Sequence, residues 1–232
     1  MSPFGAGCPT GGRGGGGGFG GGGGNAGPFV LPATYTVALV VDGKTVDTKP
    51  LRVIADADVA LTALERTKLF DMAMEMHNLQ RTAVEVSNAL TPFNTRMQEL
   101  AKEIAGKSDL PVSVKTDFDA FNKQLAVLVP KFAAGGGGRG GGGGAPGGPG
   151  AAPPSPMARL TQAKNGLMGG MWPTDQTMKA YTEAKAQMPQ VIVEANALFA
   201  KAASLAATLA KYNLALTAPQ PVKFTPPATA RK

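Results

Sequence analysis

The chain carries few of the side chains that catalysis or metal binding requires. His77 is the only histidine and Cys8 the only cysteine among 232 residues. A zinc site needs several nitrogen or sulfur ligands, and a histidine relay needs a nucleophile and an orienting partner. One histidine and one remote cysteine supply neither, and one cysteine excludes a disulfide within the chain. We therefore expect no catalytic, cofactor-binding or metal-binding residue, and we expect that the chain is not an enzyme.

Asp56 and Asp58 are close enough in sequence to act as a carboxylate pair or to begin a calcium loop. They follow a strand-like segment, where alternate residues point the same way. A calcium loop would continue with further Asp, Asn and Gly residues and close with a Glu, and this pattern is missing. We interpret the pair as the N-terminal cap of the following helix, because aspartate is a favoured cap.

Met72, Met76 and Met97 share a helical spacing in the first half of the chain. Methionine side chains are flexible and can line a groove that accepts many partners. At this spacing they more often fill a hydrophobic core, and we expect that role for them.

Two glycine-rich tracts, Gly11–Gly24 and Gly135–Gly150, dominate the composition. With the rest of the segment before Pro28, they hold 27 of the 32 glycines. A phosphate-binding loop needs a strand before it, a helix after it and usually a final Lys-Ser/Thr, and neither tract has these. We expect both tracts to be flexible linkers, because they would lose much backbone entropy on ordering and bury almost nothing.

The net charge of +7 raises the question of nucleic-acid binding. Arg-Gly segments that bind nucleic acid use many arginines and aromatic residues, whereas each tract has one arginine, Arg13 or Arg139. Most of the excess charge lies in residues 157–232, which hold nine lysines and arginines against three acidic residues. Nucleic-acid binding through basic and Arg-Gly segments is therefore our alternative hypothesis.

A β-hairpin is predicted at the start of the foldable chain. Residues 33–41 are rich in β-branched and aromatic side chains, and residues 44–54 return with the same character after Asp42-Gly43. Asp-Gly between two such runs is a strong turn signal, because the turn needs positive φ, which glycine adopts freely. Two strands alone are marginally stable in water, so the hairpin must pack on helices or form the edge of a larger β domain.

The longest periodic pattern predicts a helix with one continuous apolar stripe, which is typical of a helix that lies along a partner helix. Pro92 lies within the pattern and either kinks this helix or begins a second one that Thr91 caps. The residues of the stripe alternate three and four apart: Leu69, Met72, Met76, Leu79, Ala83, Val86, Leu90, Phe93, Met97, Leu100 and Ile104.

A second helix is predicted after Gly106, and the short connection makes it an antiparallel neighbour with a facing stripe. That stripe has the same spacing: Val114, Phe118, Phe121, Leu125, Leu128 and Phe132.

Two more helices are predicted after the second glycine tract. A short one carries Met157, Leu160, Leu167 and Met171 and ends near Gly169-Gly170. A long one begins at Pro173-Thr174-Asp175, with Pro189 as its weak point. Its stripe consists of Val191, Ala195, Leu198, Ala202, Leu205, Leu209, Tyr212 and Leu216, and the solvent side carries Lys179, Lys201 and Lys211.

The predicted fold is mainly α: an antiparallel helical bundle with long coiled-coil-like helices and one shared core, preceded by a small β-hairpin. No run of about 20 apolar residues is evident, so we expect no membrane span. The oligomeric state stays open. The predicted divisions are a disordered Gly-rich segment (1–27), the β-hairpin (28–56), a helical hairpin (57–134), a disordered Gly/Pro-rich linker (135–156), helices that complete the bundle (157–218) and a flexible tail (219–232).

Several short motifs resemble the C-terminal region of large bacterial secreted proteins with sortilin-like, BNR-repeat propellers, which are often labelled glycosyl hydrolases. The matching segments are FVLPATYTV (29–37), VDGK (41–44), PLRV (50–53), PSPMARL (154–160) and PT (173–174). The chain departs from the family at Ala33, where Gly is usual, and at Asp56-Ala57-Asp58, where Asp-Pro-Arg is usual.

The resemblance implies a noncatalytic accessory part of such a protein. The Ser-x-Asp-x-Gly-x-Thr-Trp motif of the propeller repeats does not occur in this sequence, so no catalytic residue can be transferred. The implied architecture is the last hairpin of an Ig-like or FlgD-like β domain, followed by a helical bundle with an insertion. The implied partner is the propeller of the parent protein or another envelope protein, and the implied location is extracellular or in the cell envelope, with no signal peptide expected in this chain.

Overall fold

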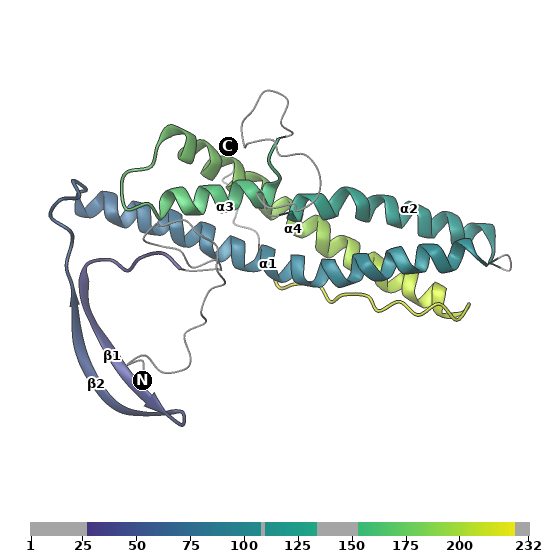
Figure 1. The fold of residues 1–232 in the computed structure, drawn as a ribbon, viewed down its shortest axis with the longest axis horizontal. Helices are drawn as coiled ribbons and strands as arrows, with labels where there is room; N and C mark the ends of the chain where they lie inside the picture. The colour runs from purple at the N-terminus through teal and green to yellow at the C-terminus, as the bar shows by residue number, and fades with distance from the viewer. Residues whose placement is uncertain (1–26, 108–109, 134–152, 226–232) are drawn as a thin grey trace, which may run out of the picture.

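The computed structural model describes residues 27–107, 110–133 and 153–225 (Figure 1). Four helices pack together and follow a two-stranded antiparallel hairpin, which confirms the mainly helical prediction. The elements in chain order are β1 (Ala33–Val41), β2 (Lys44–Val53), α1 (Ala63–Ala105), α2 (Val112–Leu128), the short 3-10 helix η1 (Val129–Phe132), α3 (Pro156–Leu167) and α4 (Asp175–Ala210).

The hairpin turns at Asp42 and Gly43, which both have positive φ, 50° and 76°. These are the conformations that a tight hairpin turn requires, as the Asp-Gly pair predicted. Ala33 pairs with Val53 and Val41 with Lys44, and the register shifts once, between Leu39 and Val40. Figure 1 shows the hairpin projecting from one end of the helical bundle.

Helix α1 begins at a capping box formed by Thr62 and Glu65. The Thr62 amide donates to a Glu65 carboxylate oxygen at 2.8 Å, and the Glu65 amide donates to Thr62 Oγ1 at 3.2 Å. The prediction that Asp56 and Asp58 cap this helix is wrong, because Thr-x-x-Glu satisfies both amides reciprocally. The Asp58 amide instead donates to Asp56 Oδ1 within the preceding turn.

Helix α1 continues without a break through Pro92. Of the two alternatives that the sequence left open at this point, a second helix capped by Thr91 is therefore wrong. Thr91 Oγ1 donates to the Ser87 carbonyl at 2.9 Å, four residues back in the same helix. Pro189 likewise lies inside the unbroken helix α4. Packing of Leu90 and Phe93 in the core favours the helix on both sides of Pro92 and offsets the lost backbone hydrogen bond.

The predicted apolar stripe of α1 is buried, with one exception. Met72 is only half-buried, and Ala73 takes its place in the core. Both residues fit a helical step from Leu69, three residues or four, and only the position of the neighbouring helices decides between them. Met76 and Met97 are fully buried, as expected for core methionines.

Helices α1 and α4 run the length of the bundle, and α2 and α3 each cover one half of it (Figure 1). Helix α3 begins next to the end of η1, because the Ser155 hydroxyl donates to the Ala133 carbonyl. Ser155 also caps α3 by accepting from the Ala158 amide at 3.0 Å. The described residues on either side of segment 134–152 thus contact each other, and α2, η1 and α3 form one interrupted helical column.

One core joins all four helices. Phe93 of α1 packs edge-to-face against Phe121 of α2, with ring centroids 6.0 Å apart, and against Phe199 of α4 at 6.5 Å. Such aromatic pairs contribute about 0.5–1.5 kcal/mol beyond their buried area. The shared core expected from the sequence is therefore present, and α2 packs against α4 as well as against α1.

Two helix ends differ from the sequence predictions. Helix α3 ends at Leu167, so Met171 lies outside it and is exposed. Helix α4 ends at Ala210, so Tyr212 and Leu216 follow the helix instead of continuing its stripe. Asn213 has a positive φ of 58°, which reverses the chain and ends the helix. The predicted solvent side is confirmed, because Lys179, Lys201 and Lys211 are exposed.

The chain after α4 returns along the bundle as an extended segment (Figure 1). Asn196 of α4 holds it by two bonds: its amide nitrogen donates to the Val222 carbonyl and its amide oxygen accepts from the Val222 N–H, both at 2.9 Å. Val222 and Phe224 also pack against the core. The expected flexible tail from residue 219 is thus wrong for residues 219–225, because Asn196 holds the backbone of Val222 and two apolar side chains of the segment pack on the core.

Helix α4 is also long and apolar enough to cross a membrane, by length and composition alone. An 18-residue window within it has a mean hydropathy of 1.3. The sequence prediction of no membrane span overlooked this window, in which alanines raise the hydropathy. The core helix of a folded bundle passes the same test, and 39% of the window is buried against the other helices. One such helix is weak evidence of a membrane span.

Candidate functional site

Exposed apolar side chains gather in and beside the hairpin. In the described part of the chain, single exposed apolar residues also occur on the helices, where they are normal. A group of them on one element suggests an interaction surface. The residues of this group are Phe29, Val30, Val37, Leu39, Val40, Val41, Val46, Leu51 and Ile54.

The strand register gives the hairpin two faces, one of which is apolar along β1. Tyr35 pairs with Leu51, and Val37 and Leu39 follow at alternate positions of β1 on the same side. Tyr35, Val37, Leu39, Leu51 and Val53 lie on one side, which we call the apolar face. Lys49 pairs with Val37 and Asp47 pairs with Leu39, so these two charged residues border the face along β2. The middle of the apolar face is open to solvent, with Val37 52%, Leu39 57% and Leu51 52% exposed.

The opposite side of the hairpin is mainly polar. It carries Thr34, Thr36, Ala38, Thr48, Pro50 and Arg52, which alternate with the residues of the apolar face. A strand pair with one apolar and one polar side normally buries the apolar side on another layer of the protein. Here the helices do not provide that layer, because the hairpin projects from the bundle (Figure 1).

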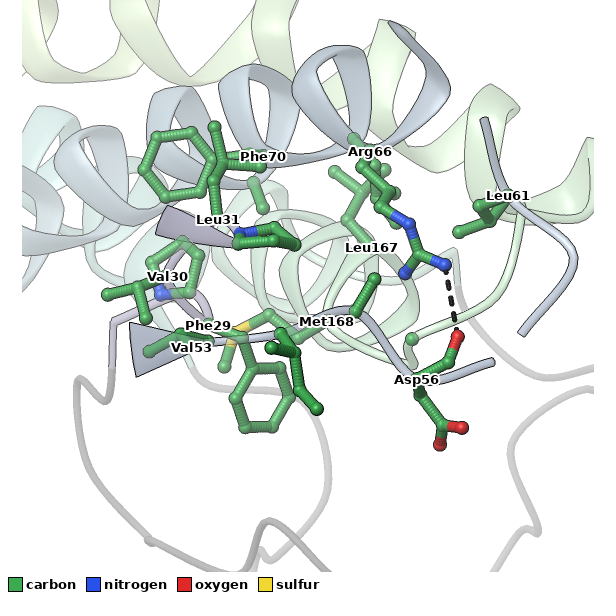
Figure 2. A pocket seen from close by; sticks show the side chains of 17 residues that line it. Phe29, Val30, Leu31, Val53, Asp56, Leu61, Arg66, Phe70, Leu167 and Met168 are labelled. Carbon is green, nitrogen blue, oxygen red and sulfur yellow. Dashed lines mark hydrogen bonds between the residues drawn. The ribbon is translucent and has the colours of Figure 1, made fainter. Parts of the chain in front are cut away.

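A hollow of about 170 Å³ lies at the base of the hairpin, where the strands join the bundle (Figure 2). Phe29, Val30 and Leu31 come from the chain before β1, and Phe70 and Leu167 come from helices α1 and α3. Figure 2 shows these apolar side chains around the hollow. A cavity of about 150 Å³ is large enough for benzene, and small-molecule sites are typically 300–1,000 Å³. The hollow therefore has room for one large apolar side chain.

The polar groups at the hollow are occupied with local structure. The Arg66 guanidinium donates to the carbonyls of Val59 at 2.8 Å and Asp56 at 3.4 Å, and the second of these bonds is drawn in Figure 2. Arg66 therefore fixes the connection between β2 and α1. The Tyr35 hydroxyl donates at 2.6 Å to the carbonyl of Leu31, a residue that lines the hollow. These bonds hold the hairpin base in place and leave an apolar lining.

The residues that the sequence singled out for chemistry do not meet in the described structure. Asp56 and Asp58 lie in the turn that Arg66 fixes, and His77 lies half-buried about three turns beyond Arg66 along α1. Within residues 27–107, 110–133 and 153–225, no three His, Cys, Asp or Glu side chains could hold a metal ion together. Cys8, Arg13 and Arg139 lie outside the described residues.

A polar cluster between α1 and α4 escaped the sequence reasoning. The Tyr181 hydroxyl donates to a Glu75 carboxylate oxygen at 2.5 Å, and the Lys185 ammonium donates to Glu75 at 2.9 Å and to Tyr181 at 3.2 Å. Burial and the nearby carboxylate raise the pKa of Tyr181, and the hydrogen bond to Glu75 raises the pKa of Lys185. Both groups therefore stay protonated near neutral pH, and the cluster acts as a clamp between the two long helices.

Lys164 is a buried charge on the apolar side of α3, only 3% exposed. Its ammonium donates to Gln80 of α1 at 2.8 Å, and the Gln80 amide donates to Thr161 at 3.2 Å. Burial lowers the pKa of Lys164. The sequence contained the signal, since Lys164 lies at helical spacing between Leu160 and Leu167. Lys164 does not line the hollow, so its part in this structure is to join α3 to α1.

Neither a scan against protein-family models nor searches of curated proteins and of solved structures find a match to this chain. The best candidate for a functional site is therefore judged on its geometry. That candidate is the apolar face of the hairpin together with the hollow at its base.

Proposed function

We propose that this chain is a noncatalytic interaction module and that the apolar face of the hairpin is its working surface. The observation that carries the proposal is the exposure of Val37, Leu39 and Leu51 on one side of a two-stranded sheet. Fully burying such a side chain contributes about 1.5–3 kcal/mol, so covering three half-exposed ones contributes about 3 kcal/mol. Two strands are marginal without a further layer, and a partner that supplies the layer stabilises both proteins.

The helical bundle supplies the rigid support for this surface. Arg66 and Tyr35 fix the two ends of the hairpin base, and Leu69 of α1 joins the base to the core. A surface held on a rigid base loses less entropy on binding than a loose one, which improves affinity. The hollow beside the base accepts one large apolar side chain of the partner, next to the apolar face.

The family resemblance points to the kind of partner. Three of its five matching segments, residues 29–37, 41–44 and 50–53, form the hairpin and its base. We therefore propose that the hairpin is the last one of an Ig-like or FlgD-like β domain and that the long helices behave as coiled-coil-like supports. The chain is then an accessory C-terminal part of a secreted or envelope-associated protein with a sortilin-like propeller, and its partner is the β-rich part of that protein.

A binding experiment with matched variants tests this proposal. The purified chain is titrated with a separately produced propeller and β domain of the family that it resembles, and binding is followed by calorimetry. Leu39→Thr with Leu51→Thr should weaken binding at least about tenfold, because two apolar contacts are lost. The control is Thr36→Ala with Thr48→Ala on the opposite face, which should leave binding unchanged.

Two results would contradict the proposal. The first is equal binding by the wild type and by the Leu39→Thr/Leu51→Thr variant. The second is release of sugars from glycans by the isolated chain, which would mean that the chain carries a catalytic site of its own.

A further inference from the structure

The two outer edges of the hairpin differ sharply in composition. Strand β2 carries Lys44, Asp47, Lys49, Pro50 and Arg52. Strand β1 reads ATYTVALVV and has no charge and no proline in nine residues. Proteins protect open sheet edges from pairing with other chains by placing lysines, other charges and prolines there. The β2 edge has this protection, and the β1 edge lacks it.

An unprotected edge of this length is suited to accept another strand. All residues of β1 except Tyr35 are exposed. A strand paired with β2 on one side still presents backbone N–H and C=O groups on the other side, and an added strand satisfies them. Because side chains alternate between the faces, the added strand must place apolar residues beside Val37 and Leu39.

From this edge we propose that a second copy of the chain pairs its own β1 with β1, antiparallel and centred on Val37. Val37 is the middle residue of Ala33–Val41, so this register pairs all nine residues. It places Tyr35 opposite Leu39 of the other copy and Ala33 opposite Val41, with apolar residues on the same side. When the two-fold axis passes through a residue pair, the apolar faces of both copies lie on the same side of the new sheet. A shift of the register by one residue would place the apolar face of one copy beside the polar face of the other. The contact closes as a two-fold dimer.

The net charge does not prevent this pairing. Each copy carries a net charge of +7, yet the two β1 strands bring no charged side chain together. In the four-stranded sheet β2–β1–β1–β2, the basic β2 strands lie outermost. Three strand spacings, about 14 Å, then separate them, which exceeds the Debye length of about 8 Å at physiological ionic strength. Repulsion between the copies is therefore largely screened at the contact.

The dimer deepens the proposed function without replacing it. The edge binds the second copy, and the apolar faces of both hairpins lie side by side as one larger surface for the β-rich partner. This role for the larger surface rests on the proposed function, but the pairing of β1 with β1 is measured on the chain alone. The two ideas can therefore fail separately.

Sedimentation equilibrium of the purified full chain over a wide range of concentrations tests whether this dimer forms. The expected mass rises with concentration to twice the 23.6 kDa of one chain. Thr36→Lys with Ala38→Lys should prevent this rise, because the register places the lysines of one copy opposite those of the other. Like charges that face each other across strands destabilise the pairing, and we expect dissociation at least about tenfold easier.

Two further variants separate loss of pairing from misfolding. Thr36→Glu with Ala38→Lys alters the same two positions but places opposite charges across the contact, so it should restore the dimer. Thr48→Lys makes the same kind of change on the polar side of β2 and should leave the dimer intact. Circular dichroism spectra of all variants should match the wild type.

The register has its own readout. In a Cys8→Ser background, Val37→Cys should form a disulfide-linked dimer on oxidation, because residues paired across an antiparallel contact have Cα atoms about 4.5–5.5 Å apart, within disulfide range. Thr48→Cys on the other edge should not cross-link.

Three results would overturn the inference. The wild-type chain could keep the mass of one copy at every concentration, the Thr36→Lys/Ala38→Lys variant could still dimerise, or Thr48→Lys could abolish the dimer. The wild type could instead be monomeric, with binding of the β-rich partner lost in Thr36→Lys/Ala38→Lys but kept in Thr48→Lys. The β1 edge would then bind a strand of that partner. That outcome would refute the dimer and leave the proposed function standing.

Discussion

Gly166→Ala tests how closely α3 and α4 approach each other. A Cβ atom at position 166 would lie 2.6 Å from Thr177 Cγ2, 2.7 Å from Thr177 Oγ1 and 3.2 Å from Thr177 Cβ. The first two distances are shorter than carbon atoms tolerate, so either the helices or the Thr177 side chain must move. Glycine at this position is therefore explained by packing and not by helix propensity.

The expected size of the effect follows from two opposing terms. Overpacking of this kind costs about 1–3 kcal/mol. Replacing glycine by alanine inside a helix gains about 1 kcal/mol. We expect Gly166→Ala to lower the free energy of unfolding by about 1 kcal/mol, which corresponds to roughly 2–4 °C in Tm for a chain of this size.

The double variant isolates the contact. Thr177→Ala removes both atoms that clash and leaves only the Cβ contact at 3.2 Å. Gly166→Ala/Thr177→Ala should therefore recover most of the loss, with a coupling energy of about 1–2 kcal/mol in a double-mutant cycle. Urea unfolding followed by far-ultraviolet circular dichroism measures all four proteins.

Gly106→Ala is the matched control. A Cβ atom there would meet its nearest neighbour, the Glu103 carbonyl oxygen, at 3.7 Å, an ordinary contact, and the φ of −82° suits any residue. This variant should be neutral or gain up to about 1 kcal/mol. The reasoning is refuted if Gly166→Ala gains the full propensity term and Thr177→Ala shows no coupling to it.

Three further predictions concern the core, a buried charge and the insertion. Leu100→Ala should lower the free energy of unfolding by about 2–5 kcal/mol in urea, because Leu100 is fully buried. Leu64→Ala, at an exposed site of α1, should change it by less than about 0.5 kcal/mol. Equal effects of the two substitutions would contradict the assigned stripe. Burial lowers the pKa of Lys164 in the folded chain, so the unfolded chain keeps the Lys164 proton to a higher pH than the folded chain does. The free energy of unfolding of the wild type should therefore rise as the pH increases from the lowered pKa to the ordinary lysine pKa. Lys164→Met should abolish that rise in alkaline urea titrations, and an unchanged pH profile would refute the assignment. Replacing residues 134–152 by about five Gly/Ser residues should keep the fold and raise the free energy of unfolding by about 1 kcal/mol. Ser155 and Ala133 already contact each other, and a shorter loop costs less entropy to close. A large loss of stability would show that the segment takes part in the core.

The helical stripes and the Asp-Gly turn were the features that sequence reasoning predicted best. Both depend on local periodicity or on one backbone conformation, which neighbouring residues largely determine. The choice between Met72 and Ala73 could not be made this way, because both lie on the correct side of α1 and only the positions of α3 and α4 decide. The end of α4 was missed for a similar reason, since Tyr212 and Leu216 keep a helical spacing after the chain has left the helix.

The candidate site was only partly predictable. Alternation in residues 33–41 indicates a strand with one apolar side, but whether that side is covered depends on where the hairpin points. The hollow at its base joins four segments that are distant in sequence, so no local pattern reveals it. The Glu75–Tyr181–Lys185 clamp joins α1 to α4 across more than a hundred residues and has the same limitation.

The central claim is that the hairpin offers its apolar face to solvent and that the bundle is folded without it. The urea midpoint of Leu39→Thr/Leu51→Thr tests this claim most directly. With both side chains more than half exposed, we predict a midpoint for the helical signal within error of the wild type. A fall comparable to that of Leu100→Ala would mean that the face is packed in the core, and the account would be wrong.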